Sequence, residues 1–245
     1  MIPKIIHYCW FGRGKKPEMA LKCIDSWKKY CPDYEIKEWN EDNFPIEKYP
    51  YAKEALEKRK FAFVTDVVRL YALYTEGGIY MDTDVEVLKP LDDYLNNTAF
   101  SGFEAKDRVP TGIMGSIKGG KWAKDNLDYY NNRHFVKEDG SLDLQTNVQT
   151  ITMLMVQNGL ILNNEYQQLR DYITMYPNDF FCPKSWEDGK IYLTNRTVTI
   201  HHFSGSWKPK NQLFKYKIRK VIHNFKLQID KVLGKFDILD ISSKL

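Results

Sequence analysis

Extended and helical patterns alternate over the first 88 residues, and this order limits the folds open to the chain. Short runs rich in β-branched and aromatic residues lie at 4–11, 34–39 and 79–88. Apolar residues recur at helical spacing between them, at 17–32 and 53–78, and the second helix is expected in two pieces. A strand–helix–strand–helix order predicts an α/β sheet with helices on both faces.

Further elements are expected downstream, and no linker or repeat interrupts the first 205 residues. The patterns predict a strand at 99–105, a further strand or a turn at 113–119, a helix at 147–159 and a hairpin-like segment at 191–203. A chain of 245 residues with 43% hydrophobic and 14% aromatic residues can bury one sizeable core. We therefore expect one compact domain.

Charge and cysteine usage exclude several classes of protein. A net charge of +4 is too small to indicate a nucleic-acid partner. The start, MIPKIIHYCWFG, is a poor signal peptide, and no apolar run is long enough to cross a bilayer. The four cysteines form no CxxC pair, so reduced, buried thiols are expected, with a Cys23–Cys31 disulfide as the alternative. These features predict a cytoplasmic, soluble protein.

The segment EGGIYMDTDVEVLKPLD, residues 76–92, places two carboxylates at the end of an apolar strand. Side chains alternate in an extended chain, so Asp82 and Asp84 are expected on the same side. Carboxylates this close repel each other unless a cation or donors compensate, and Mg²⁺ or Mn²⁺ accepts such oxygens. Alone, the D-x-D pattern is also compatible with an exposed acidic turn.

Asp66 and Arg69 lie three residues apart on the preceding helix and share a face. An exposed ion pair is one interpretation. The other is a covered pair with further partners, because apolar residues extend the same stripe and unpaired buried charge is costly. Tyr80, on the Asp82 side of the strand, belongs either to the core or to the pocket.

Three segments together resemble glycosyltransferase family 32, the DXD-containing sugar transferases. These are IPKIIHYCWFG (2–12), FVTDVVRLYALYTEGGIYMDTDVEVLKPLD (63–92) and HHFSGSWK (201–208). The chain is also similar to the catalytic domain of the large clostridial glucosylating toxins. The resemblance implies a GT-A fold (Rossmann-like), a nucleotide-sugar donor, a divalent metal and retention of anomeric configuration.

The resemblance also implies roles for particular residues. It gives Trp10 as the base-stacking residue, Asp66 and Arg69 as contacts of the donor sugar and phosphate, and Tyr80 as a pocket residue. Asp84 and Asp82 would hold the metal. The spacing of His202, Gly205 and Lys208 matches the H-x-x-G-x-x-K segment of related transferases. There the histidine ligates the metal, the glycine lets the backbone approach the diphosphate, and the lysine neutralises phosphate charge. Trp207 would cover the site. His202 is therefore expected at the metal rather than His201, and imidazole favours Mn²⁺ over Mg²⁺.

Other polar residues are weaker candidates for the pocket. Relatives often carry Thr-Gly-Pro near the reacting face of the sugar, whereas this chain has Thr146-Asn147-Val148. Gln145 and Asn147 are candidates there, as are Glu104 and the Thr111–Gly112 turn.

The chain changes composition after the last motif. Residues 208–235 contain nine basic residues against one acid, and apolar residues repeat at steps of four and three. We expect a catalytic domain at 1–207 and a basic amphipathic helical extension at 208–245. The extension could pack on the domain, form a coiled-coil contact or, through residues 211–236, lie on anionic lipid.

The leading hypothesis is a metal-dependent retaining glycosyltransferase. It would move a hexose from a nucleotide-sugar, with UDP favoured over GDP, to a glycan or lipid-linked acceptor in surface (capsular) polysaccharide synthesis. It would be cytoplasmic or peripheral at the inner face of the plasma membrane. The alternatives are a metal-dependent phosphodiester or sugar-nucleotide hydrolase and a non-enzymatic, cation-stabilised binding module.

Overall fold

The computed structural model describes residues 1–110, 112–185 and 188–205. Internal contacts divide the chain into one unit made of 1–184 and 192–204, and a second made of 185–191 and 205–245. The first unit contains every helix and strand discussed below. The predicted extension at 208–245 and its lipid-facing stretch at 211–236 lie outside the described residues.

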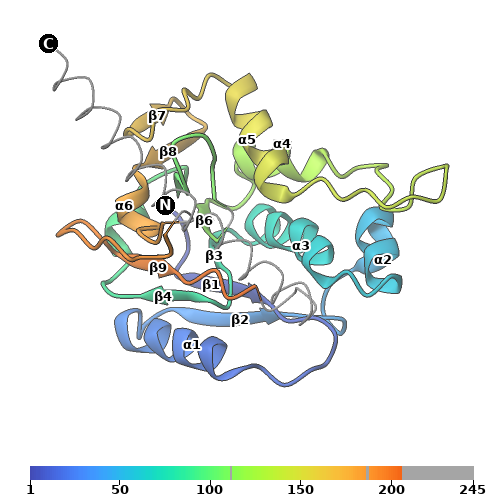
Figure 1. Cartoon of the computed structure of the whole chain (residues 1–245), viewed down its shortest axis with the longest axis horizontal. Helices are drawn as coiled ribbons and strands as arrows, with labels where there is room; N and C mark the ends of the chain where they lie inside the picture. The colour runs from blue at the N-terminus through green and yellow to red at the C-terminus, as the bar shows by residue number, and fades with distance from the viewer. Residues whose placement is uncertain (111, 186–187, 206–245) are drawn as a thin grey trace, which may run out of the picture. The chain divides into compact units, whose positions relative to one another are not determined.

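A seven-stranded mixed sheet forms the centre of the first unit, in the order β2–β1–β3–β6–β5–β8–β7 (Figure 1). β1 pairs in parallel with β2 and β3, and β5 with β8, whereas β6 and β7 run antiparallel to their neighbours. The strands are β1 Ile5–Cys9, β2 Glu35–Trp39, β3 Gly78–Met81, β5 Ala99–Gly102, β6 Ile113–Ser116, β7 Gln167–Leu169 and β8 Ile173–Tyr176.

Helices cover both faces of this sheet, which confirms the predicted α/β fold. On one face α1 (Glu18–Tyr30) buries Cys23, Ile24 and Trp27 against residues of β1 and β3. Figure 1 shows α3 and its neighbours on the other side of the strands from α1. The remaining helices are α2 Pro50–Glu57, α3 Phe61–Thr75, α4 Lys121–Asp128, α5 Asn147–Gln157 and α6 Asn178–Phe181, with two short 3₁₀ helices, η1 Ile46–Lys48 and η2 Asp92–Tyr94.

The start of the 76–92 segment folds as predicted, and its second half does not. Gly77 has a left-handed φ of 73°, and its N–H donates to Leu73 O, which ends α3 at the glycines. The expected strand 79–88 is then broken into β3 and β4 (Val85–Val87). Asp82 N–H donates to Gly112 O, and Val85 N–H donates to Asp82 O, so residues 82–85 form a turn.

The break sends β4 out of the main sheet. β4 pairs antiparallel with β9 (Thr199–His201) in a separate two-stranded sheet, with Val85 opposite His201. The hairpin predicted at 191–203 is therefore wrong: residues 194–197 make a turn, and β9 takes its partner from far upstream. This long-range pairing brings the last described motif to the D-x-D turn.

Two further expectations concern thiols and membrane crossing. Cys9, Cys23, Cys31 and Cys182 are all free and buried, which confirms the predicted reduced thiols and excludes the Cys23–Cys31 disulfide here. Among the residues that the structure describes, no helix is both long and apolar enough to span a bilayer.

His7 on β1 is fully buried and held as a neutral imidazole. Trp39 Nε1–H donates to its Nδ1 at 3.1 Å, which leaves Nε2 to carry the proton that bonds Gly77 O at 2.7 Å. Burial lowers the pKa of His7 below its ordinary value. The unfolded chain therefore binds this proton at a higher pH than the folded chain, and stability falls as the pH decreases through about 6.5.

We predict that the Tm drops between pH 8 and pH 5 and that His7→Gln reduces this drop, since glutamine can accept from Trp39 and donate to Gly77 without titrating. Thermal unfolding followed by circular dichroism measures it. His134→Gln, at an exposed position, is the control. An unchanged pH slope in the His7 variant would show that the proton is taken up elsewhere.

Candidate functional site

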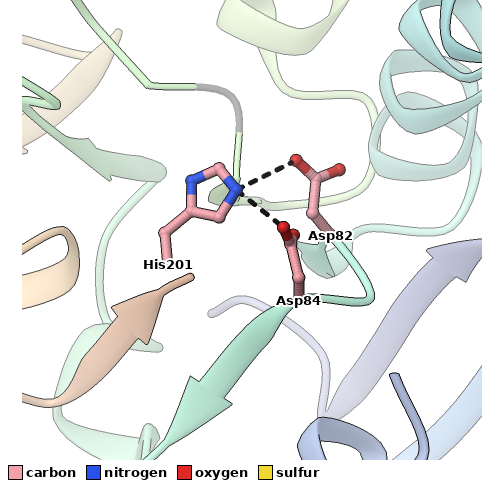
Figure 2. Close-up of side chains that lie close together, drawn as sticks. All are labelled: Asp82, Asp84 and His201. Atoms are coloured by element: carbon pink, nitrogen blue, oxygen red, sulfur yellow. Dashed lines mark ion pairs between the residues drawn. The ribbon is translucent and has the colours of Figure 1, made fainter. Parts of the chain in front are cut away.

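Asp82, Asp84 and His201 meet where β3 and β9 end and β4 begins (Figure 2). His201 Nε2 lies 3.2 Å from Asp84 Oδ1 and 3.9 Å from Asp82 Oδ2. One ligand atom from each side chain lies within 4.8 Å of the others. Asp82 and Asp84 thus converge as the sequence predicts, but through a turn and not through strand alternation.

The histidine compensates part of the negative charge in this cluster. Burial disfavours the imidazolium, but the Asp84 carboxylate outweighs it and raises the pKa of His201 well above its ordinary value. For Asp84, burial alone would raise the pKa, but His201 and the Ser204 N–H, 2.7 Å from Asp84 Oδ2, hold it well below the usual range. A protonated imidazole thus occupies the position where a cation is favoured.

The pair on α3 is covered and connected to the same cluster. Asp66 and Arg69 are 7% and 5% exposed. Arg69 Nη2 lies 3.4 Å from Asp66 Oδ1, and Arg69 Nη1 lies 3.4 Å from Asp82 Oδ1. The exposed ion-pair interpretation is therefore wrong, and Arg69 links the helix to the D-x-D turn.

Tyr80 belongs to both the core and the pocket. Its ring is buried beneath the Arg69 guanidinium, 4.6 Å from the ring centroid, and its hydroxyl donates to Asp82 Oδ1 at 2.8 Å. The hydroxyl thus fixes one Asp82 oxygen, and the other faces His201.

Burial of so many acids shifts their titration. Burial raises the pKa of Asp66 to about 7, with Arg69 opposing the shift and Asp82 adding to it. Burial also raises the pKa of Asp82, again against Arg69. Three carboxylates face Arg69 and His201, so the fully ionised cluster carries an excess negative charge. A divalent cation in place of the His201 proton would bring it to neutrality.

The structure reverses the expected choice between the two histidines. Neighbouring residues of a strand end point to opposite sides, so only one of the two histidines faces the site. That residue is His201, because its position opposite Val85 turns its ring towards the D-x-D turn. His202 Nε2 instead bonds Glu86 Oε2 at 2.8 Å, away from both aspartates.

Gly112 supports both halves of the cluster. Its carbonyl accepts from Asp82 N–H at 2.8 Å. Its Cα lies against the His201 ring, since a Cβ on Gly112 would be 2.6 Å from His201 Nδ1. Among the described residues that nitrogen is buried with no hydrogen bond of normal geometry, and the nearby Cys182 thiol helps to raise the pKa of His201. The sequence suggested this turn only as a pocket candidate; pairing between β3 and β6 places it beside Asp82.

Of the two residues considered for the reacting face, Asn147 is the one with an unused amide. It is 3% exposed at the start of α5, and neither of its side-chain polar atoms makes a hydrogen bond of normal geometry with a described residue. It lies close enough to Asp66 to lower the pKa of that carboxyl. Gln145 is structural, because its amide bonds Thr150 and lies 3.5 Å from Arg133.

Of the remaining candidate residues, three lie in the part of the chain that the structure describes and three do not. Trp10 follows β1, partly buried, and its Nε1–H donates to Gly14 O at 2.6 Å. It lies at the same sheet edge as Asp82 because β1 and β3 are parallel. Glu104 is buried after β5. Gly205 has a left-handed φ of 62° and belongs to the second unit, whereas Thr111, Trp207 and Lys208 lie outside the described residues.

The donor set of the cluster fits a divalent metal. Carboxylate oxygens suit Mg²⁺ and Mn²⁺, and one imidazole moves the preference towards Mn²⁺. The residues that could hold the ion are Asp82, Asp84 and His201. Arg69, next to Asp82, offers a second cationic group.

Comparison with known proteins gives the same region a family. Residues 17–101 match the family "Glycosyltransferase sugar-binding region containing DXD motif". This range contains α1, α3 and the D-x-D turn. The resemblance expected from the motifs is confirmed over this range.

Two curated relatives and one solved structure are similar to the chain. The chain is 32% identical over 126 residues to inositol phosphoceramide mannosyltransferase 3 of Schizosaccharomyces pombe, covering 48% of this chain and 34% of the relative. It is 26% identical over 228 residues to a glycosyltransferase of Acanthamoeba polyphaga mimivirus, covering 88% and 87%. A glycosyltransferase involved in glycosylation of the major capsid of PBCV-1 superposes with a TM-score of 0.48 at 13% identity, covering 91% of this chain and 100% of the other. The chain spans about a third of the length of the first of these relatives.

Proposed function

We propose that the chain is a metal-dependent glycosyltransferase using a nucleotide-sugar donor, because residues 17–101 match the DXD-containing sugar-binding region of a glycosyltransferase family. The observation that carries this proposal is the joining of Asp82, Asp84 and His201 within 4.8 Å, beside the buried Arg69. Such a group suits a metal-bound diphosphate leaving group.

The chemistry needed at this site is stabilisation of the leaving group. When bound, a divalent ion would offset the charge that develops on the diphosphate as the bond to the anomeric carbon breaks. Asp84, His201 and Asp82 would hold it, and Tyr80 would fix the Asp82 oxygen that does not face His201. Lys208 and Trp207 are proposed from the motif as diphosphate contacts, with Gly205 allowing close approach.

The donor sugar would lie against α3 and the start of α5. Asp66 and Arg69 are covered and preorganised, so they can exchange part of their mutual contact for sugar hydroxyls and phosphate without reorganising the helix. The unused amide of Asn147, next to Asp66, would bond a further hydroxyl. Trp10 at the edge of β1 would stack on the nucleobase.

The proposal extends to the donor, the metal, the stereochemistry, the acceptor and the location of the protein. We propose a UDP-sugar, Mn²⁺ and retention of configuration. A glycan or lipid-linked acceptor in surface polysaccharide synthesis is proposed from the sequence resemblance, and the named lipid mannosyltransferases favour a lipid-linked one. We also propose a cytoplasmic location. The predicted basic extension would place residues 211–236 on anionic lipid at the inner membrane face.

Incubation with a panel of UDP- and GDP-sugars and Mn²⁺, Mg²⁺ or EDTA tests the proposal. We expect slow hydrolysis of one donor without acceptor, dependent on the metal, and retention in any transfer product by NMR. Hydrolysis of many phosphodiesters without sugar preference would favour the hydrolase alternative. No turnover of any compound would favour the binding module.

Gly112→Ala tests the support beneath the proposed metal site. The new Cβ would lie 2.6 Å from His201 Nδ1, so the ring must leave its present position beside Asp84. We predict a loss of roughly 10–100-fold in Mn²⁺ affinity, as for other residues that orient metal ligands. Isothermal titration of the metal measures it.

Gly119→Ala is a suitable control because a Cβ at Gly119 meets nothing within 4 Å, although its φ of 70° adds backbone strain unrelated to the site. Mn²⁺ affinity should be retained in this variant. Unchanged affinity in the Gly112 variant would mean that His201 does not ligate the metal.

A further inference from the structure

Four cations that form no ion pair with a described residue lie on two neighbouring loops. We call them the cationic rim: Lys15, Lys58, Arg59 and Lys60. All four residues are exposed. Residues 58–60 connect α2 to α3, and Lys15 lies between β1 and α1. Among the described residues none of the four lies within ion-pair distance of a carboxylate, whereas Arg13 and Lys16 nearby are paired with Asp42 and Glu38.

The two loops touch at the sheet edge that carries the candidate site. A Cβ on Gly12 would lie 2.5 Å from Phe61 Cε2, so the loop after β1 packs against the first residue of α3. Asp66 is six residues beyond Lys60, about 9 Å along the helix at 1.5 Å per residue. The rim therefore borders the site on the side of Asp66 and Arg69.

The described carboxylates do not neutralise the positive charge of the cationic rim. The run 57–60 contains a single carboxylate, Glu57, against three cations. Arg59 also keeps a left-handed φ of 54°, a conformation that costs a residue with a Cβ about 1 kcal/mol. Its guanidinium lies 5.6 Å from the Phe61 ring centroid and forms no ion pair with a described residue. Adjacent like charges repel, so an anion at this position would be bound favourably.

We propose that the cationic rim binds a phosphate-type anion carried by the acceptor, so that the acceptor is a phosphorylated glycan or glycolipid and not a neutral sugar. This inference rests on the proposed function, since it concerns the second substrate of that same site. The diphosphate of the donor has its own compensating groups: Arg69 and the metal that Asp82, Asp84 and His201 would hold. The rim begins about 9 Å along α3 from Asp66. It is free to hold the charge of the acceptor while the acceptor's hydroxyl reaches the donor sugar.

The test uses the full chain with Lys58→Gln, Arg59→Gln and Lys60→Gln combined. The control combines Lys48→Gln, Lys118→Gln and Lys137→Gln, three exposed lysines for which the described residues supply no ion pair. Sedimentation measures binding to phosphatidylcholine vesicles with and without phosphatidylinositol, and titration calorimetry measures binding of soluble inositol phosphate. Metal-dependent donor hydrolysis is followed in parallel.

We expect the rim variant to lose at least about tenfold in binding to an inositol phosphate group, while the control keeps it. Loss confined to vesicles identifies a lipid headgroup, and loss confined to the soluble probe identifies a soluble phosphorylated acceptor. Equal binding by both variants overturns the inference. An equal fall in donor hydrolysis also overturns it, because the rim would then serve the donor; absence of hydrolysis in the wild type refutes the proposed function instead.

Discussion

Asp84→Asn should reduce metal-dependent donor turnover by at least about 10²–10³-fold, the range for removing one electrostatic contact to a developing charge. The amide carries no charge and is a poor ligand for a divalent ion. It can still accept from Ser204 N–H, which bonds Asp84 Oδ2 at 2.7 Å. The effect is therefore expected on chemistry and not on folding.

Stability should change little in this variant. His201 has a raised pKa because Asp84 is beside it, so the imidazole can release its proton when that charge is removed. No uncompensated buried cation is left, and we expect the Tm without metal to move by at most about 4 °C. Asp125→Asn, whose carboxylate pairs with Lys121 on α4, is the control. Normal turnover by the Asp84 variant would show that the D-x-D turn is not the reaction centre.

His201→Gln and His202→Gln should differ strongly, although the two residues are adjacent. His201 Nε2 lies 3.2 Å from Asp84, whereas His202 Nε2 lies 2.8 Å from Glu86. We predict that the His201 variant loses at least about 100-fold in Mn²⁺ affinity and a similar factor in kcat/KM at low metal concentration. The His202 variant should stay within about threefold in metal affinity, because the residue acts outside the proposed ligand set.

Mn²⁺ titration calorimetry, with turnover measured over a range of metal concentrations, separates the two. Saturating Mn²⁺ should restore part of the activity of the His201 variant, since the defect is in metal affinity. The reverse result, with the larger loss at His202, would support the assignment made from the H-x-x-G-x-x-K spacing and would mean that the strand end shifts by one residue when metal binds.

Sequence pattern alone predicted those elements whose cause is local. Pro17 and Pro32 bound the region of α1, Gly77 ends α3, and apolar runs identify β1, β2 and β3. The residues of the D-x-D turn and the Asp66–Arg69 pair also follow from spacing. Their chemistry is fixed by side-chain type and by positions a few residues apart, so the candidate site could be found before its geometry was known.

Tertiary structure decided which strands pair and which histidine faces the aspartates, because both depend on contacts between segments far apart in the chain. The split of the expected 79–88 strand, the pairing of β4 with β9 and the support from Gly112 all depend on such contacts. Sequence alone indicated that at most one of the two adjacent histidines faces the aspartates, since neighbouring residues of a strand point to opposite sides. Only the register opposite Val85 decided that it is His201, because a shift of one residue exchanges the two faces.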